Sequence, residues 1–145
     1  MQRKNILILC TGNSCRSQIA EGWGNALGAN VAEFRSAGIE AHGKNPRAIQ
    51  VMRECEVDIS GQESSKLTEG MLAWADIVIT VCGHADEVCP DIPSKSEKRH
   101  VPFDDPAKAV GSDDEILQEF RRVRDEIKRY VIHLNEELRD KSLCL

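Results

Sequence analysis

One short segment combines a cysteine with an arginine six positions later. Residues 10–17 read Cys-Thr-Gly-Asn-Ser-Cys-Arg-Ser, between an apolar run that ends at Cys10 and a helical pattern that begins near Cys15. Backbone N–H groups in such a turn and at a helix N-terminus can converge on one anion. The guanidinium of an arginine can hold two oxygens of that anion. The segment therefore predicts a site for a tetrahedral oxyanion, with these binding residues: Thr11, Gly12, Asn13, Ser14, Cys15, Arg16 and Ser17.

The same surroundings make Cys10 a candidate nucleophile. A helix N-terminus and a neighbouring cation favour the thiolate, which is the reactive form of cysteine, and Ser17 is close enough in sequence to donate a hydrogen bond to it. The alternative is that Cys10 is a small buried residue closing a strand and Arg16 an ordinary surface arginine. The strand–loop–helix placement favours the reactive interpretation, and the sequence has no glycine-rich Walker or dinucleotide motif.

Two further cysteines flank a polar segment. Cys82 ends the apolar run that begins at Asp76, and Cys89 follows seven residues later. In a doubly wound sheet of order 2-1-3-4, the first and third strands are neighbours, so Cys10 and Cys82 should meet at the carboxyl edge. We expect a mobile loop from Gly83 onward that brings Cys89 to Cys82. Three thiols at one edge predict a relay by thiol–disulfide exchange.

Other roles for the cysteines stay open at this point. Cys82 and Cys89 could be inert small residues, and zinc is a weaker competitor because their spacing fits no common structural site. The remaining three cysteines are expected to serve packing or to be incidental: Cys15, Cys55 and Cys144.

A candidate general acid lies in the segment Phe103-Asp104-Asp105-Pro106, which follows the predicted fourth strand. A carboxyl at the same edge could protonate a leaving oxygen while Cys10 attacks. Pro106 keeps Asp105 out of the helical region, although Asp-Pro is also a common turn signal. The four histidines form no pair at ligand spacing and are expected at the surface: His42, His84, His100 and His133.

Alternating strands and helices should position these residues. Strands are predicted near residues 5–10, 32–36, 76–82 and 99–103, and helices near 15–27, 46–54 and 67–74. Ser112 and Glu115 form a capping-box signature before a long final helix, whose apolar stripe comprises Ile116, Phe120, Val123, Ile127, Val131, Leu134 and Leu138. The fold class predicted is α/β, a single-domain three-layer sandwich with a four-stranded parallel sheet of order 2-1-3-4 and helices on both faces.

Length and charge set the outer limits. The 145 residues suit one domain over residues 1–145, and 30% charged with 41% hydrophobic residues is the balance of a globular protein. A net charge of −5 argues against nucleic acid or an anionic membrane as the main partner. The first apolar run is too short to span a membrane. We therefore expect a cytoplasmic protein, whose six cysteines are not a disulfide framework.

Four stretches together resemble the thioredoxin-coupled arsenate reductases, which share the low-molecular-weight tyrosine phosphatase fold. They are the loop at residues 10–17, Ser-Ala-Gly-Ile-Glu-Ala-His-Gly at 36–43, Cys82 with Cys89-Pro90, and Phe-Asp-Asp-Pro-Ala at 103–107. The resemblance spans nearly the whole chain. It implies arsenate as substrate and thioredoxin as reductant for a monomer without a bound organic cofactor.

The resemblance also implies a mechanism. Cys10 attacks arsenate held by the loop and Arg16, while Asp105 protonates the departing oxygen. Cys82 then attacks Cys10, which releases arsenite, and Cys89 attacks Cys82 to leave a Cys82–Cys89 disulfide that thioredoxin reduces. In this family, Asn13 and Ser17 help to hold the loop and the thiolate.

One departure from the family concerns potassium. Some members bind the ion near the loop through an Asn, a Glu, a Ser and an Asp. Asn13, Glu21 and Ser36 match here, but Ser65 stands in the place of the Asp, so a potassium site is not expected to be complete.

Two rival functions remain. A phosphatase for phosphotyrosine or small esters would use the same loop and Asp105, but such enzymes usually carry aromatic residues after the Asp-Pro pair, where Ala107 and Lys108 stand here. A phosphatase also has no need of Cys82 and Cys89, although weak side activity is expected. A non-enzymatic arsenite or metal binder would use the thiols and leave Arg16 without a role. Glutaredoxin with glutathione is an alternative reductant to thioredoxin.

Overall fold

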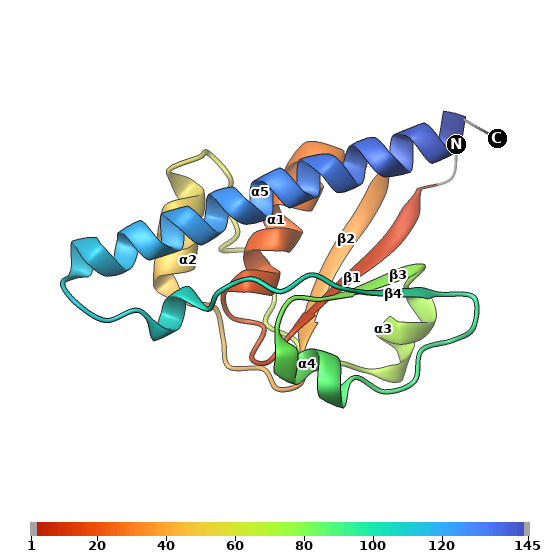
Figure 1. Cartoon of the computed structure of the whole chain (residues 1–145), viewed down its shortest axis with the longest axis horizontal. Coiled ribbons are helices and arrows are strands. Elements are labelled where there is room, and N and C mark those ends of the chain that lie inside the picture. Colours follow the sequence, from red (N-terminus) through yellow and green to blue (C-terminus); the bar gives the residue numbers. More distant parts are fainter. Residues whose placement is uncertain (1–2, 144–145) are drawn as a thin grey trace.

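Four parallel strands form one sheet in the computed structural model, which describes residues 3–143 and the side chains of residues 3–140 (Figure 1). The strands are β1 (Lys4–Cys10), β2 (Ala32–Gly38), β3 (Ile77–Thr80) and β4 (Glu97–His100). They lie in the order β2-β1-β3-β4, and each pairing is parallel. The predicted order 2-1-3-4 is confirmed. The carboxyl ends of all four strands consequently meet at one edge of the sheet.

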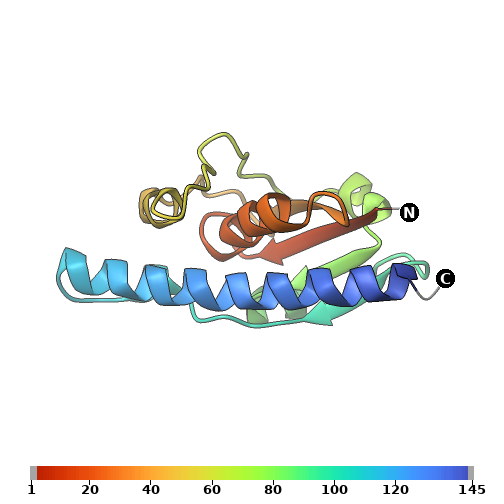
Figure 2. The same cartoon turned by 90° about the horizontal axis from the view of Figure 1, so that it is seen from above.

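Helices cover both faces of this sheet, as predicted. They are α1 (Arg16–Gly28), α2 (Pro46–Arg53), α3 (Glu69–Trp74), α4 (Gly83–Val88) and α5 (Asp113–Leu143), with a short 3₁₀ turn η1 (Pro106–Lys108). Figure 1 shows α1 and α5 on one side of the strands and α3 and α4 on the other. Figure 2 shows that α5 runs along the whole length of the molecule. None of the helices within residues 3–143 is both long and apolar enough to cross a membrane.

The core lies between the sheet and these helices. Residues 6–10 of β1 are all buried, as expected for a strand covered on both faces. Six residues of the predicted stripe on α5 are buried, and Ile116 is half-buried. The capping box is also confirmed, because Ser112 N donates to Glu115 Oε1 at 3.2 Å and Glu115 N donates to Ser112 Oγ at 3.2 Å.

Two predictions near the carboxyl edge were wrong in detail. The fourth strand begins at Glu97 and ends at His100, earlier than residues 99–103. Val101 N and Phe103 N still donate to β3 and the residue after it, but Pro102 has no N–H and the regular ladder ends. The segment after Cys82 is the helix α4 (Gly83–Val88) and not a loop, and Ala85 N in its first turn donates to Cys82 Sγ at 3.4 Å.

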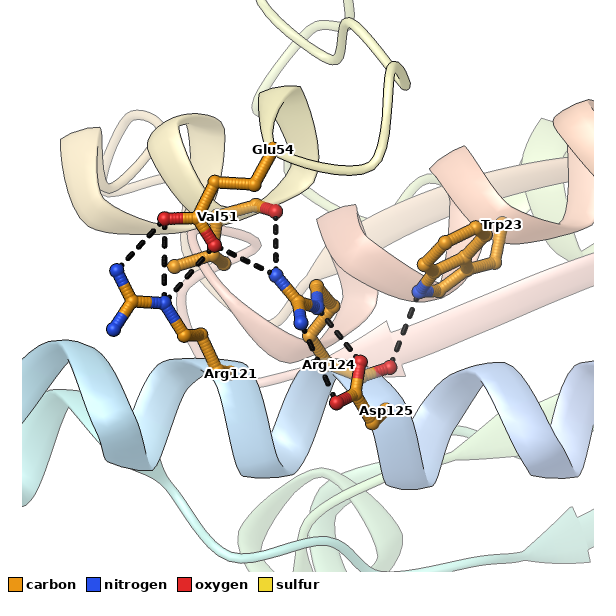
Figure 3. Close-up of polar contacts among 6 residues, drawn as sticks. All are labelled: Trp23, Val51, Glu54, Arg121, Arg124 and Asp125. Carbon is orange, nitrogen blue, oxygen red and sulfur yellow. Dashed lines mark hydrogen bonds and ion pairs between the residues drawn. The ribbon is translucent and has the colours of Figure 1, made fainter.

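A polar network ties α5 to α2 and α1 (Figure 3). Glu54 accepts hydrogen bonds from Arg121 and from Arg124, and Arg124 Nη1 also donates to the carbonyl oxygen of Val51 at 2.9 Å. Trp23 Nε1 donates to the backbone oxygen of Arg124 at 3.1 Å. These contacts fix α1 against α5. The first turn of α1 forms part of the oxyanion loop (residues 10–17).

Candidate active site

The loop between β1 and α1 (residues 10–17) is held in its conformation by hydrogen bonds from the segment that follows β2. Backbone N–H groups in the segment 39–45 donate to four loop carbonyls at 2.8–3.1 Å. Because the loop carbonyls point toward that segment, the loop N–H groups turn to the other side, where they can face an anion. The loop carbonyls bonded in this way belong to Cys10, Thr11, Gly12 and Ser14.

Asn13 fixes the conformation of this loop through its buried side chain. Its backbone has φ of 49°, a left-handed conformation that asparagine tolerates better than most residues. Its fully buried side chain donates to Ser17 Oγ at 2.8 Å and to Ser36 Oγ at 2.9 Å. Its Oδ1 accepts from Ser65 N at 2.7 Å and from Gln18 Nε2 at 3.2 Å. Four neighbours thus hold one side chain in place.

Cys10 lies at the end of β1 with 3% of its surface exposed. Its Sγ is 2.8 Å from Ser17 Oγ. Ser17 already accepts a hydrogen bond from Asn13, so its single hydroxyl proton is free to point at the sulfur of Cys10. The Cys10 sulfur can thus accept a hydrogen bond from Ser17 while it lines the cavity next to the loop.

That cavity has a volume of about 650 Å³ and is lined by four of the predicted catalytic residues: Cys10, Arg16, Cys82 and Asp105. Arg16 Nη1 donates to the carbonyl oxygen of Phe103 at 3.0 Å, and Nη2 lies 3.6 Å from Asp105 Oδ2. Asp105 Oδ1 accepts from Ala107 N at 3.0 Å, which holds the carboxyl group on the wall of the same cavity. A cation for an oxyanion and a carboxyl for proton transfer therefore lie together.

Cys82 lines the same cavity as Cys10. It follows β3, whose Thr80 is in register with Leu9 of β1, and its Sγ lies 3.3 Å from Thr11 Oγ1. Its exposed fraction is 7%. The strand order thus brings the two thiols to one site, as expected.

Cys89 does not belong to this site in the structure. It follows the last residue of α4, is half-buried, and is absent from the cavity wall. Burial raises the pKa of the Cys89 thiol, partly offset by the charge of Lys98. Within the structure, α4 therefore separates Cys89 from the cavity that Cys82 lines.

Cys15 lies inside the loop but is not suited to be a nucleophile. Burial, followed by the negative charges of Asp105 and Cys10, raises the pKa of Cys15 to about 12. The thiol stays protonated at neutral pH, in keeping with a packing role. Within the described residues, Cys10, Cys15, Cys55, Cys82 and Cys89 are free thiols.

The residues that correspond to a potassium site do not fit the ion. Glu21 is the one carboxylate of the set; it accepts from Ser36 Oγ at 2.6 Å, and burial raises its pKa. Ser65 offers a backbone N–H to Asn13 where an acidic side chain would be needed. The positive charge of Lys44 already acts on Glu21. Among the residues that the structure describes, no group of three or more His, Cys, Asp or Glu side chains could hold a metal.

His42 is exposed, as predicted, but it also lines the cavity, which the sequence did not lead us to expect. Its ring packs on Gly12 so closely that a Cβ added there would lie 2.4 Å from Nδ1. Its Nε2 is 2.6 Å from Glu40 Oε2, and it lines the cavity together with Cys10. The available signal was its place in the stretch 36–43, close after a strand that ends at the same edge.

Comparison with known proteins shows which family has this fold and loop. The model of the low molecular weight phosphotyrosine protein phosphatases matches residues 5–143. The chain belongs to this family.

Among individual proteins, this chain is similar to arsenate reductases. The chain is 53% identical over 131 residues to an arsenate reductase of Halalkalibacterium halodurans, covering 90% of this chain and 94% of the relative. It is 49% identical over 127 residues to an arsenate reductase of Bacillus subtilis, covering 88% and 91%.

Solved structures give the same fold with two different activities. An arsenate reductase in the phosphate-binding state aligns with a TM-score of 0.76 and 32% identity, covering 93% of this chain and 98% of the other. The YwlE arginine phosphatase from Geobacillus stearothermophilus aligns with a TM-score of 0.80 and 25% identity, covering 97% and 96%. This member of the phosphatase family is thus similar to arsenate reductases of the same fold.

Proposed function

We propose that this chain reduces arsenate to arsenite through a relay from Cys10 to Cys82 to Cys89, with thioredoxin as the final reductant. The observation that carries the proposal is the second thiol. Cys82 shares one cavity with Cys10 and is held 3.3 Å from Thr11 of the oxyanion loop. Hydrolysis of a phosphate ester has no use for a thiol in that place, whereas reduction requires one. The arsenate reductases at about 50% identity support the same substrate.

The first step joins sulfur to arsenic. Arsenate binds to the loop N–H groups and Arg16, and the Cys10 thiolate attacks arsenic to form an S–As bond. Asp105, 3.6 Å from Arg16, gives a proton to the hydroxyl oxygen of the arsenate, which leaves as water. Arsenic remains in the +5 state.

The second step carries the two electrons. The Cys82 thiolate attacks Cys10 Sγ, and the electron pair of the S–As bond goes to arsenic, which leaves as arsenite in the +3 state. A Cys10–Cys82 disulfide remains. Cys89 then loses its proton and attacks Cys82 Sγ, which releases Cys10 as a thiolate, and the dithiol of thioredoxin reduces the Cys82–Cys89 disulfide.

Weak hydrolysis of phosphate esters is expected beside the reductase activity, because phosphate has the shape of arsenate and the loop, Arg16 and Asp105 would serve both. Ala107 and Lys108 line the cavity just after the Asp-Pro pair, and neither offers an aromatic face to a phenyl ring. Potassium is not required in this proposal, because Ser65 stands where an acidic ligand would be needed and offers its N–H to Asn13. Turnover in potassium and in sodium buffers of equal ionic strength should agree.

The test measures arsenite released by the purified chain with thioredoxin and thioredoxin reductase, and separately with glutaredoxin and glutathione. Multiple turnovers with thioredoxin are expected, and a single turnover at most for Cys82→Ser. Hydrolysis of p-nitrophenyl phosphate should survive Cys82→Ser and Cys89→Ser and vanish in Cys10→Ser. Normal cycling of Cys82→Ser with thioredoxin would refute the relay. A clear preference for glutaredoxin would show that thioredoxin is not the reductant.

A further inference from the structure

The helix α4 separates the two thiols that the relay must join. Cys82 and Cys89 lie directly before and after α4, seven positions apart. At 1.5 Å per residue, a helix holds such Cα atoms about 10 Å apart. A disulfide requires a Cα separation of roughly 4.4–6.8 Å. The helix must therefore unwind before Cys89 can attack Cys82.

Little of α4 itself resists this unwinding. Among its six residues, all of them described, Ala85 is the one buried residue. A helix of this length has no stability of its own in water. What holds it must come from contacts with neighbouring elements.

Asp86 supplies those contacts. Its Oδ1 accepts from Thr80 Oγ1 of β3 at 3.1 Å and lies 3.1 Å from Lys98 Nζ of β4. Lys98 Nζ also donates to the backbone oxygen of Asp86 at 3.1 Å, which satisfies a carbonyl near the end of the helix. His100 Nδ1 lies 2.9 Å from the same Thr80 hydroxyl. The ammonium of Lys98 holds the pKa of Asp86 below its usual range.

We propose that Asp86 is a positioning residue that keeps α4 wound, and that release of its contacts with Thr80 and Lys98 sets the rate at which Cys89 reaches Cys82. The inference rests on the proposed function for its chemistry. The step gated is the attack of the Cys89 thiolate on Cys82 Sγ, in which the electron pair of the Cys10–Cys82 bond leaves with Cys10. No outside oxidant enters, because one disulfide replaces another.

The test uses Asp86→Asn and Lys98→Met in the full chain, with Glu87→Gln as the matched control. Glu87 is exposed on the same helix, and its side chain makes no hydrogen bond or ion pair with any described residue. Each protein is mixed with one equivalent of arsenate, quenched with acid at intervals, alkylated and mapped by mass spectrometry. Asp86→Asn and Lys98→Met should form the Cys82–Cys89 disulfide roughly threefold to tenfold faster, the effect of losing a charge-assisted bond. Formation of the Cys10–Cys82 disulfide should stay within about twofold.

A second measurement does not depend on arsenate. Amide hydrogen exchange of α4 in the reduced proteins should quicken by roughly threefold to tenfold in Asp86→Asn and stay unchanged in Glu87→Gln. Equal exchange in α4 for Asp86→Asn and the wild type would overturn the inference even in an active enzyme. A second disulfide that forms at the wild-type rate in both variants would also overturn it. Faster exchange in a protein that makes no arsenite would refute the proposed function and leave the role of Asp86 in holding α4 supported.

Discussion

Replacement of Asn13 by alanine should unsettle the oxyanion loop through two separable effects. An ordinary L-residue at φ of 49° costs roughly 1–2 kcal/mol relative to right-handed backbone. Removal of the side chain also takes away the acceptor of Ser65 N at 2.7 Å, in a partly buried position, and the loss of such a partner costs at most about 1–3 kcal/mol. The donors to Ser17 and Ser36 are lost as well. The expected fall in the free energy of unfolding is about 3 kcal/mol.

Asn13→Gly is the matched variant, because glycine removes the same hydrogen bonds but tolerates the left-handed backbone. It should recover about 1 kcal/mol of the loss seen in Asn13→Ala. Urea denaturation followed by far-UV circular dichroism measures both, and the melting temperature of Asn13→Ala should fall by about 10 °C. A loss below about 1 kcal/mol in Asn13→Ala, or a glycine variant no more stable than the alanine variant, would show that Asn13 does not hold the loop as described.

Three other predictions concern single side chains. Asp105→Asn should slow single-turnover arsenite formation by roughly 10²–10⁴-fold, measured by rapid quench, and an unchanged rate would remove Asp105 from proton transfer. Cys15, with its pKa raised to about 12 by burial first, should stay unlabelled by iodoacetamide at pH 8 in the folded protein; labelling as fast as that of Cys10 would contradict its protonated state. Arg121, and then Arg124, hold the pKa of Glu54 below its usual range, so the stabilisation is present above that range and disappears as the pH falls through the lowered pKa. Glu54→Gln should thus lose about 1 kcal/mol at pH 7 after solvent screening and less as the pH falls toward 3, as measured by urea denaturation; an equal loss at both pH values would refute the ionic origin.

The parts of the fold that local pattern determines could be predicted from the sequence. β1 follows from a continuous apolar run. α5 follows from its apolar stripe and from the capping box at Ser112 and Glu115, both of whose hydrogen bonds are present in the structure. The oxyanion loop is also local, since Cys10 and Arg16 lie on either side of one turn. Its strand–loop–helix context was therefore visible in the sequence.

Features that depend on tertiary contacts could not be predicted in the same way. α4 has six residues and no apolar stripe, and it persists through the bonds of Asp86 to residues 6 and 12 positions away. His42 reaches the cavity because its N–H donates to the carbonyl oxygen of Gly12 at 2.9 Å, a contact between segments that no periodicity indicates. The start of β4 at Glu97 reflects pairing with β3, since all four residues of β4 are polar.

The relay is tested most directly by mapping the disulfides left after one turnover without a reductant. The reduced chain is mixed with a small excess of arsenate, arsenite is counted, and the thiols are alkylated and assigned by mass spectrometry. One arsenite per chain, a Cys82–Cys89 disulfide and a free Cys10 are expected. Arsenite released without any disulfide between these cysteines, or no arsenite at all from a chain that still hydrolyses p-nitrophenyl phosphate, would contradict the reductase and favour a phosphatase.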